Sequence, residues 1–269
     1  MNPTYQSGFY APGRGTAKYP ALWDGCVGAW NPGLGNTGLS LRDWSGSQNN
    51  GTLIGGPTWG VTDGRQALSF DGGYDYVDAG NSSSLDLLDN FTILAWIKRT
   101  GFPAHPMIVV KGNSHANNNY QFFLNHVEGY KIALWFSDSS SDWSTIYANT
   151  IVSSNVWHHV VAVYNNSTNT VTFYLDGIAD GTKTIAGTPL AKTPSLRIGS
   201  RAPDFYFSGQ IDDTRIYNRA LSPNEIRLLA QRPGIAYERA PRKFYSLPAA
   251  AGNPTGILIN NLQSIRLGL

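Results

Sequence analysis

The chain has 269 residues, of which 41% are hydrophobic and 14% are charged, as expected of one folded domain with a large core. Its 29 glycines, 15 prolines and 12% aromatic residues favour strands and tight turns over helices. The one cysteine, Cys26, excludes an internal disulfide framework and a zinc site of several thiolates. No run of 18 apolar residues occurs, so no membrane-spanning helix is expected. Residues 1–19 lack the apolar stretch of a secretory signal.

The two ends differ from the middle in composition. Residues 1–22 are rich in Gly, Pro and Tyr without a hydrophobic period, which predicts an extended N-terminal arm. Residues 233–269 form a second irregular segment, whose last residues alternate like an edge strand. Both ends carry more basic than acidic side chains, whereas residues 23–232 carry more acidic ones. We therefore expect an acidic body, residues 23–232, between two basic arms.

Short apolar runs between turn residues fill the predicted body. In residues 91–98 (FTILAWIK) both alternating faces are apolar, which predicts a central strand that is buried on both sides. Residues 170–176 (TVTFYLD) alternate, with Val171, Phe173 and Leu175 expected to face the core. The Asp-Gly pair that ends this run is a tight-turn signal, because glycine tolerates a positive φ. Strands at this spacing indicate a β-sandwich or barrel.

One helix is predicted after the last of these runs. Ser222 and Glu225 form a capping box, with Pro223 at the first helical position. A short apolar stripe follows at residues 226–230, and Pro-Gly at 233–234 ends the helix.

Four segments together resemble the laminin-G-like, concanavalin-A-like jelly-roll domain. They are ALSFDGGYDYVDAG (67–80), FTILAWIKR (91–99), WHHVVAVYNNSTNTVTFYLDG (157–177) and SGQIDDTRIYNRALSPNEI (208–226). The resemblance covers residues 23–232 and implies an all-β fold: a two-sheet antiparallel jelly-roll sandwich with one short C-terminal helix, here with an extended arm at each end. The fold hosts lectins, carbohydrate-binding modules, hydrolases, lyases and structural proteins, so it leaves the function open.

Two further segments resemble laminin-G-like proteins of tailed-phage and environmental viral genomes. They are the entry LWDGCVGAWNP with LRDWSGSQNNGTL (22–53) and the helix exit LLAQRPGIAYERAP (228–241). This resemblance implies a virion component.

Catalysis has little support in the sequence. Sandwich-fold glucanases use two carboxylates on one strand, but the three glutamates lie far apart and Glu225 caps a helix. Asp212 and Asp213 are adjacent, so on a strand they face opposite sides. His158 and His159 likewise face opposite sides, and in the resembling domains this segment is framework. We expect the chain not to be an enzyme and to have no catalytic residues.

Calcium is the one cofactor that the sequence predicts, in a structural role. Calcium binds six to eight hard oxygens, usually carboxylates and backbone carbonyls. In the resembling family a calcium ion often bridges the Phe-Asp-Gly loop and the Ile-Asp-Asp strand. That implies Asp71, Gly72 and Asp212 as ligands here, with Asp75 and Asp213 as nearby alternatives. The simpler alternative is that Asp71 makes an Asp-Gly turn and that Asp212 accepts a loop hydrogen bond.

Sugar binding needs exposed aromatic rings with amide or carboxylate partners. The loops at 112–120 and 137–143 contain such residues, so Tyr120, Asp142 and Trp143 are the predicted carbohydrate-binding rim. The alternative is that these Asn- and Ser-rich loops are only turns.

The leading functional hypothesis is a non-enzymatic structural component of a virus particle. It would be a capsid decoration or cement protein, or another protein of the outer virion surface, whose arms bind neighbouring subunits. Capsid or other virion proteins are the expected partners, and a homo-oligomer, with a trimer favoured by quasi-symmetric lattices, is the expected state. Aromatic and basic residues dominate interface energetics, so the predicted partner-binding residues are Tyr5, Phe9, Tyr10, Tyr19, Tyr237, Arg239, Arg242, Lys243, Phe244 and Tyr245.

Two alternatives remain open. One is a carbohydrate-binding module or lectin for adhesion, at an extracellular or cell-surface location. It is compatible with the first hypothesis, because a capsid-surface protein can also bind surface glycans. The other is a glycan hydrolase or lyase, which the shortage of glutamate disfavours. No basic run exceeds Arg242–Lys243, so neither a specific nucleic-acid partner nor membrane insertion is expected.

Overall fold

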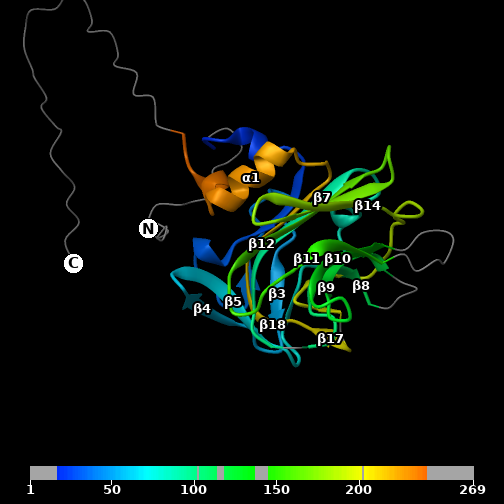
Figure 1. Cartoon of the computed structure of the whole chain (residues 1–269). Helices are drawn as coiled ribbons and strands as arrows, with labels where there is room; N and C mark the ends of the chain where they lie inside the picture. Colours follow the sequence, from blue (N-terminus) through cyan, green and yellow to red (C-terminus); the bar gives the residue numbers. More distant parts are fainter. Residues whose placement is uncertain (1–16, 102, 114–117, 137–144, 202, 241–269) are drawn as a thin grey trace, which may run out of the picture.

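The computed structural model describes residues 17–101, 103–113, 118–136, 145–201 and 203–240. They form a sandwich of two antiparallel sheets, which confirms the predicted fold class (Figure 1). In the first sheet the strand order is β14 (Ile178–Thr184), β13 (Thr170–Leu175), β12 (His158–Asn165), β7 (Phe91–Arg99), β18 (Ser208–Tyr217), β5 (Arg65–Asp71) and β4 (Thr58–Thr62), with β1 (Cys26–Trp30) also paired to β18.

The second sheet packs against the first. Its strand order is β11 (Ile146–Ile151), β10 (Lys131–Phe136), β9 (Asn118–Asn125), β8 (Met107–Gly112), β15 (Leu196–Ile198), β6 (Tyr76–Asp78), β3 (Gly51–Ile54) and β2 (Ser40–Leu41). A separate two-stranded hairpin follows β15 and consists of β16 (Ser200–Arg201) and β17 (Phe205–Tyr206). The helices are α1 (Pro223–Gln231) and the 3-10 turns η2 (Pro20–Trp23), η3 (Pro32–Leu34), η4 (Ser83–Leu85) and η6 (Ile235–Tyr237).

The main core lies between the two sheets, and strand alternation builds it. On β7, residues 91, 93, 95 and 97 are fully buried in this core, whereas Leu94 and Trp96 lie on the outer face, as the sequence predicts. On β13, Val171 and Phe173 are buried in the core and Leu175 packs against it, which is also as predicted. The turn that follows has φ of 52° and 82° at residues 176 and 177.

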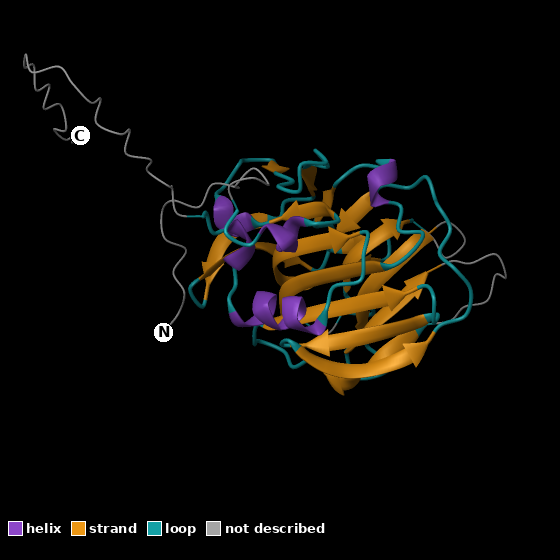
Figure 2. Ribbon diagram, turned by 90° about the horizontal axis from the view of Figure 1, so that it is seen from above, coloured by secondary structure: helices purple, strands orange, loops and turns teal. Residues whose placement is uncertain are grey.

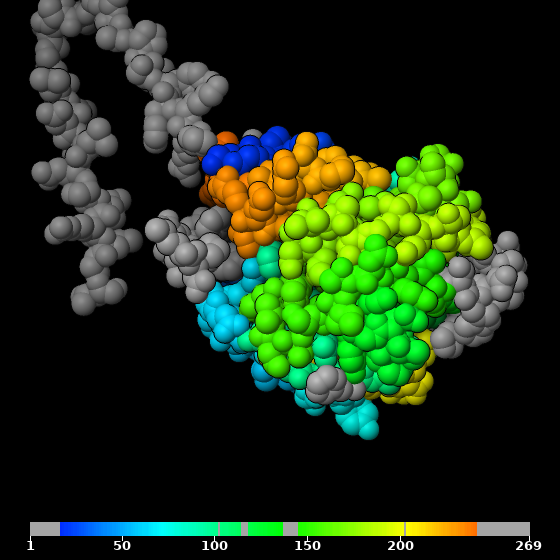
Figure 3. Space-filling view, in the orientation of Figure 1, coloured from blue at the N-terminus to red at the C-terminus, as the bar shows by residue number. Residues whose placement is uncertain are grey.

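The helix α1 and the turns η2 and η6 pack on the outer face of the first sheet (Figures 1 and 2). The predicted capping box of α1 is present, with Ser222 accepting from the Glu225 amide. Trp23 of η2 donates from Nε1 to the carbonyl of Ala236 at 2.8 Å, and its ring meets that of Tyr237 edge to face. The N-terminal segment (blue) and the C-terminal segment (orange) therefore lie side by side in Figure 3.

The structure places residues 17–22 and 233–240 in the body, whereas the sequence places them in the arms. Ala17 and Arg239 form an antiparallel bridge, and the side chain of Lys18 pairs with Glu238 at 2.8 Å. Composition misplaced these boundaries because the two short segments bury their apolar side chains only against each other and the sheet. Within the described residues, no helix has the length and apolar character needed to cross a membrane.

A buried polar network holds the C-terminal segment to the sheet. Arg215 is fully buried on β18 and donates two hydrogen bonds to Asp213, at 2.8 and 3.0 Å. The hydroxyl of Tyr237 donates to the same carboxylate at 3.2 Å. Because a buried charge is stable only when paired and hydrogen-bonded, these contacts anchor η6 to the first sheet.

Candidate functional site

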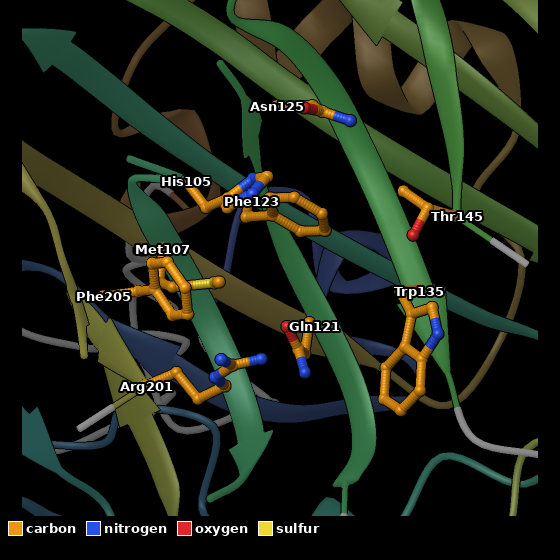
Figure 4. Close-up of a pocket in the computed structure, with 9 residues that line it drawn as sticks. All are labelled: His105, Met107, Gln121, Phe123, Asn125, Trp135, Thr145, Arg201 and Phe205. Carbon is orange, nitrogen blue, oxygen red and sulfur yellow. The ribbon is translucent and has the colours of Figure 1, made fainter. Parts of the chain in front are cut away.

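A pocket opens on the outer face of the second sheet, opposite the face that packs on the core (Figure 4). Its volume is about 180 Å³, and a cavity of about 150 Å³ holds a molecule the size of benzene. The pocket therefore has room for one six-membered ring. It is lined by His105, Met107, Gln121, Phe123, Asn125, Trp135, Thr145, Arg201 and Phe205.

Strand alternation on β9 makes the floor of the pocket. Successive side chains of a strand point to opposite faces, so residues 120, 122 and 124 lie in the core. Gln121, Phe123 and Asn125 consequently face the pocket. Residues of the neighbouring strands continue the floor in register, because Trp135 pairs with Gln121, and Met107 pairs with Phe123.

A small residue, Ala133, lies among the aromatic rings of this face. Ala133 of β10 is paired with Phe123 on one side and with Tyr147 of β11 on the other. Its methyl group fills little of the space between these rings and Trp135. The five residues Met107, Val110, Phe123, Ala133 and Trp135 form a separate apolar cluster on this face.

The β16–β17 hairpin forms one wall of the pocket. It begins at Gly199, where φ is +91° and an added Cβ would lie 2.6 Å from a ring carbon of Phe70. Glycine therefore permits the strand to leave the second sheet here. Beyond this bend the Arg201 guanidinium stacks on the Phe205 ring, 4.4 Å from its centroid. The His105 ring closes the pocket beside it, with centroids 5.3 Å from Phe205 and 5.7 Å from Phe123.

The polar side chains of the pocket include the amides of Gln121 and Asn125, the hydroxyl of Thr145 and the guanidinium of Arg201. Gln121 is 3% exposed, and its amide nitrogen has no hydrogen-bond partner among the described residues. Burial lowers the pKa of the Arg201 guanidinium, and the Asp204 carboxylate opposes that shift. None of the nine lining side chains is an aspartate or glutamate. An apolar ring surface beside the Gln121 amide can bind a ligand that has both apolar and polar faces.

The predicted carbohydrate-binding rim is not where this pocket lies. Tyr120 is fully buried in the core, and its hydroxyl donates to the carbonyl of Leu85 at 3.2 Å. Its ring is therefore not available for stacking, which corrects that prediction. Asp142 and Trp143 lie outside the described residues. The sequence analysis missed Trp135 and Gln121 because it sought sugar-binding residues only in the Asn- and Ser-rich loops. The alternation of polar Gln121 and Asn125 with apolar neighbours was the available signal.

The proposed calcium ligands are not brought together. Asp71 pairs in register with Ser208, so Asp212 lies four residues farther along β18, about 13 Å away at 3.3 Å per residue. Asp71 accepts hydrogen bonds from the amides of Gly73 and Tyr74, and Gly72 follows Asp71 in this turn. Asp212 is buried and accepts from Arg65 at 3.0 Å. Across the described residues, no group of three His, Cys, Asp or Glu side chains could hold a metal ion.

Few predicted partner-binding residues are described. Tyr237 is fully buried in the network around Asp213, so it stabilises the body and is not a surface anchor. Tyr19 is half-buried, and its hydroxyl accepts from Arg232, while Arg239 is exposed. The remaining seven lie outside the described residues: Tyr5, Phe9, Tyr10, Arg242, Lys243, Phe244 and Tyr245.

A hydrogen-bonded chain of Ser153, His158 and Asp176 lies at the surface. The Ser153 hydroxyl is 2.7 Å from Nε2 of His158, and Nδ1 of His158 is 2.8 Å from the Asp176 carboxylate. Burial raises the pKa of Asp176, but hydrogen bonds from His158 and the His159 amide outweigh it and lower the pKa overall. The Asp176 side chain is 46% exposed, whereas the aspartate of a hydrolytic triad is buried. These hydrogen bonds therefore hold the turn at residues 176–177 against β12.

The fold is that of the lectin-like β-sandwich domains. The chain belongs to the Laminin_G_3 family, described as the concanavalin A-like lectin/glucanases superfamily, whose profile matches residues 71–227. It is also 31% identical over 161 residues to Adhesion G-protein coupled receptor V1 of Danio rerio. That match covers 55% of this chain but 2% of the receptor, so the chain spans only a small part of that relative.

Solved structures share the fold at low sequence identity. Domain 4 of AbnA, a GH43 extracellular arabinanase from Geobacillus stearothermophilus, in complex with arabinotriose, matches with a TM-score of 0.62 and 20% identity. The match covers 80% of this chain and all of that domain. The binding domain of Paraclostridial Mosquitocidal Protein 1 matches with a TM-score of 0.61 and 17% identity, over 78% of this chain and 52% of that one.

Proposed function

We propose that this protein is a non-catalytic carbohydrate-binding module and that the pocket on the second sheet holds one sugar ring of a glycan. The observation that carries the proposal is the pairing of Trp135 with Gln121 at the pocket floor. An indole face stacks on the apolar C–H face of a sugar, and a side-chain amide hydrogen-bonds its hydroxyls or ring substituents. Both groups stand on neighbouring strands, which hold them rigidly before a ligand arrives.

The non-catalytic part of the proposal rests on the charges in the pocket. Glycoside hydrolysis uses a pair of carboxylates on either side of the scissile bond. The nine residues that line the pocket include no carboxylate, so a bound glycan would meet neither a general acid nor a nucleophile there. Rigid strands, an apolar floor and a single cation serve binding instead.

A glycan microarray with the full-length protein tests the proposal. We expect saturable binding to one class of glycan, and a loss of affinity of at least about tenfold for Trp135→Ala, because buried aromatic anchors dominate binding energy. Gln121→Leu keeps the size of the side chain but removes its amide, and should also weaken binding. Trp157→Ala is the matched control, because Trp157 is a half-buried tryptophan whose indole donates to Thr62 on the first-sheet side. Unchanged binding in both pocket variants would reject this site.

A structural role in a virus particle is the second candidate. The observation that favours it is the bridge between Ala17 and Arg239, because both terminal segments then begin at one place on the body. Two segments that leave from one point could bind a single neighbouring subunit. Light scattering of full-length protein beside residues 17–240 tests this role: an oligomer that becomes a monomer on trimming supports it, and two monomers at all concentrations contradict it.

A further inference from the structure

We propose that the sugar unit in the pocket carries an acetyl group, whose carbonyl accepts a hydrogen bond from Gln121 and whose methyl group packs on Phe123. This inference rests on the proposed carbohydrate-binding function and specifies its ligand class. The observation that points to it is a buried amide nitrogen without a hydrogen-bond partner among the described residues, on a side chain directed into the pocket (Figure 4).

Gln121 is a polar residue within the apolar cluster on the outer face of the second sheet. It pairs in register with Val110 of β8 on one side and with Trp135 of β10 on the other, and both partners belong to that cluster. Phe123, two residues along the same strand, belongs to it as well. Valine and phenylalanine side chains have no hydrogen-bonding group, and an indole only donates. None of these neighbours can therefore accept a hydrogen bond from the Gln121 amide.

The buried amide nitrogen is costly for the ligand-free protein. Gln121 is 3% exposed, and its Nε2 has no hydrogen-bond partner among the described residues. A buried donor that loses its bond to water without gaining another destabilises the folded state. A site with such a group discriminates strongly in favour of a ligand that satisfies it. Binding therefore explains this amide better than stability of the fold does.

A second row of side chains lies beside this donor. Phe123 pairs in register with Met107 of β8 and with Ala133 of β10, and all three side chains are apolar. The row lies two residues from Gln121 along β9, which is about 6.6 Å at 3.3 Å per residue. The pocket therefore presents a donor next to a strip of apolar surface. A group that fits both has a hydrogen-bond acceptor joined directly to a small apolar part.

An acetyl group has this composition. Its carbonyl oxygen accepts a hydrogen bond from Nε2 of Gln121, and its methyl group, bonded to the same carbonyl carbon, packs against Phe123 and Met107. A sugar hydroxyl can accept the same hydrogen bond but has no apolar part for the strip. An ammonium group has no acceptor. Sugars carry acetyl groups on nitrogen or on oxygen, and the test separates these two sources.

Matched oligosaccharides with and without acetyl groups test the proposal on the full-length protein. Triacetylchitotriose is compared with cellotriose and with the deacetylated amine of the same chain, and O-acetylated xylotriose is compared with xylotriose. In at least one set we expect the acetylated member to bind about 10- to 100-fold more tightly, from one buried hydrogen bond and one buried methyl group. Preference in the first set identifies an N-acetyl ligand, and preference in the second identifies an O-acetyl ligand.

Substitution of Gln121 locates the effect. Gln121→Met keeps the size of the side chain but removes the donor, so the acetylated and unmodified members should bind equally. The unfolding midpoint of the ligand-free variant should rise, because the buried donor without a partner is gone; a residue that mainly stabilises the fold would give the opposite shift. Gln231→Met is the matched control, because Gln231 is exposed at the end of α1, away from the pocket.

Saturation-transfer NMR on wild type gives a readout that needs no variant. The acetyl methyl protons of the preferred oligosaccharide should receive at least as much saturation from the protein as the protons of its sugar rings, because the methyl group lies against Phe123 and Met107.

The outcomes separate this inference from the function on which it rests. Equal binding of acetylated and unmodified members by wild type, lost in Trp135→Ala, would keep the proposed function and reject the acetyl group. A preference that persists unchanged in Gln121→Met would reject the assigned donor. If Gln121→Met does not fold, acetyl methyl protons without saturation transfer would still overturn the inference. Absence of binding to every oligosaccharide, on the microarray as well, would reject the function and the inference together.

Discussion

Asp212 on β18 and His159 on β12 lie on opposite sides of Trp96, and each is paired in register with it. Both side chains are fully buried. Burial raises the pKa of Asp212 to about 7 and lowers the pKa of His159 to about 4. The Arg65 guanidinium opposes the shift of Asp212, while Asp213 adds to it. Both nitrogens of His159 are without a hydrogen-bond partner among the described residues, so its neutral form is the one that the site accepts.

These two groups should give opposite pH dependences of stability. Asp212 contributes stability below its ordinary pKa of 3.8 that is lost as the pH rises toward 7. His159 contributes stability above its ordinary pKa of 6.5 that is lost as the pH falls toward 4. Between about pH 4 and 6.5 the two effects offset each other. We therefore expect Asp212→Asn to steepen the loss of stability on acidification relative to wild type, and His159→Leu to make stability fall as the pH rises.

Urea unfolding at intervals from pH 4 to 8 measures both slopes. The informative quantity is the difference between each variant and wild type, because the other carboxylates then cancel. If the stability difference from wild type changed with pH in the same direction for both variants, the two groups would not have opposite effects on the pH dependence of stability.

Gly199 should be sensitive to substitution because it shapes the pocket wall. An added Cβ would lie 2.6 Å from the Phe70 ring, so Gly199→Ala should lose roughly 1–3 kcal/mol from overpacking, in addition to the cost of its positive φ. Gly80→Ala is the control, since φ there is +75° and nothing lies within 4 Å of the added Cβ. Gly199→Ala should also weaken glycan binding, because Arg201 and Phe205 follow the bend. Equal stability losses in the two variants would argue against the clash.

The turn at Asp71 should owe its stability to hydrogen bonds and not to a metal. Asp71→Ala removes the acceptor for two backbone amides, and we expect a loss of about 1–2 kcal/mol. The loss should be the same in millimolar calcium and in chelator, because Asp71 and Asp212 are too far apart to share an ion. Thermal unfolding under both conditions measures this. A wild-type midpoint that rises with calcium, and an Asp71→Ala midpoint that does not, would restore the metal site.

Ser153 should have no catalytic role. The exposed Asp176 carboxylate is screened by water and therefore gives little stabilisation to a charged imidazole. We expect wild type and Ser153→Ala to hydrolyse p-nitrophenyl acetate at the same background rate, while Asp176→Ala lowers the unfolding midpoint. Turnover by wild type that is lost in Ser153→Ala would identify a hydrolase instead.

The sequence predicts correctly those structural features whose physical cause lies within a few neighbouring residues. The two-sided burial of β7, the inward residues of β13, the turn at 176–177 and the capping box at Ser222 all depend on strand or helix periodicity and on neighbouring backbone atoms. Loop composition misplaced Tyr120, because this residue lies on β9, where successive side chains point to opposite faces, and its own side chain points into the core. Its neighbour Gln121 faces the pocket.

The candidate site depends on segments that are distant in sequence. Gln121 and Trp135 meet through the pairing of β9 with β10, and Arg201 reaches them from a hairpin some 80 residues beyond Gln121 along the chain. The separation of Asp71 from Asp212 follows from strand register, and the burial of Tyr237 follows from packing of both ends on one sheet. Sequence alone established the periodic elements, because hydrophobic alternation and capping act within a few residues, and the family resemblance supplied the sandwich. Register and the path of the hairpin belong to tertiary structure, since they depend on which distant strands pack together.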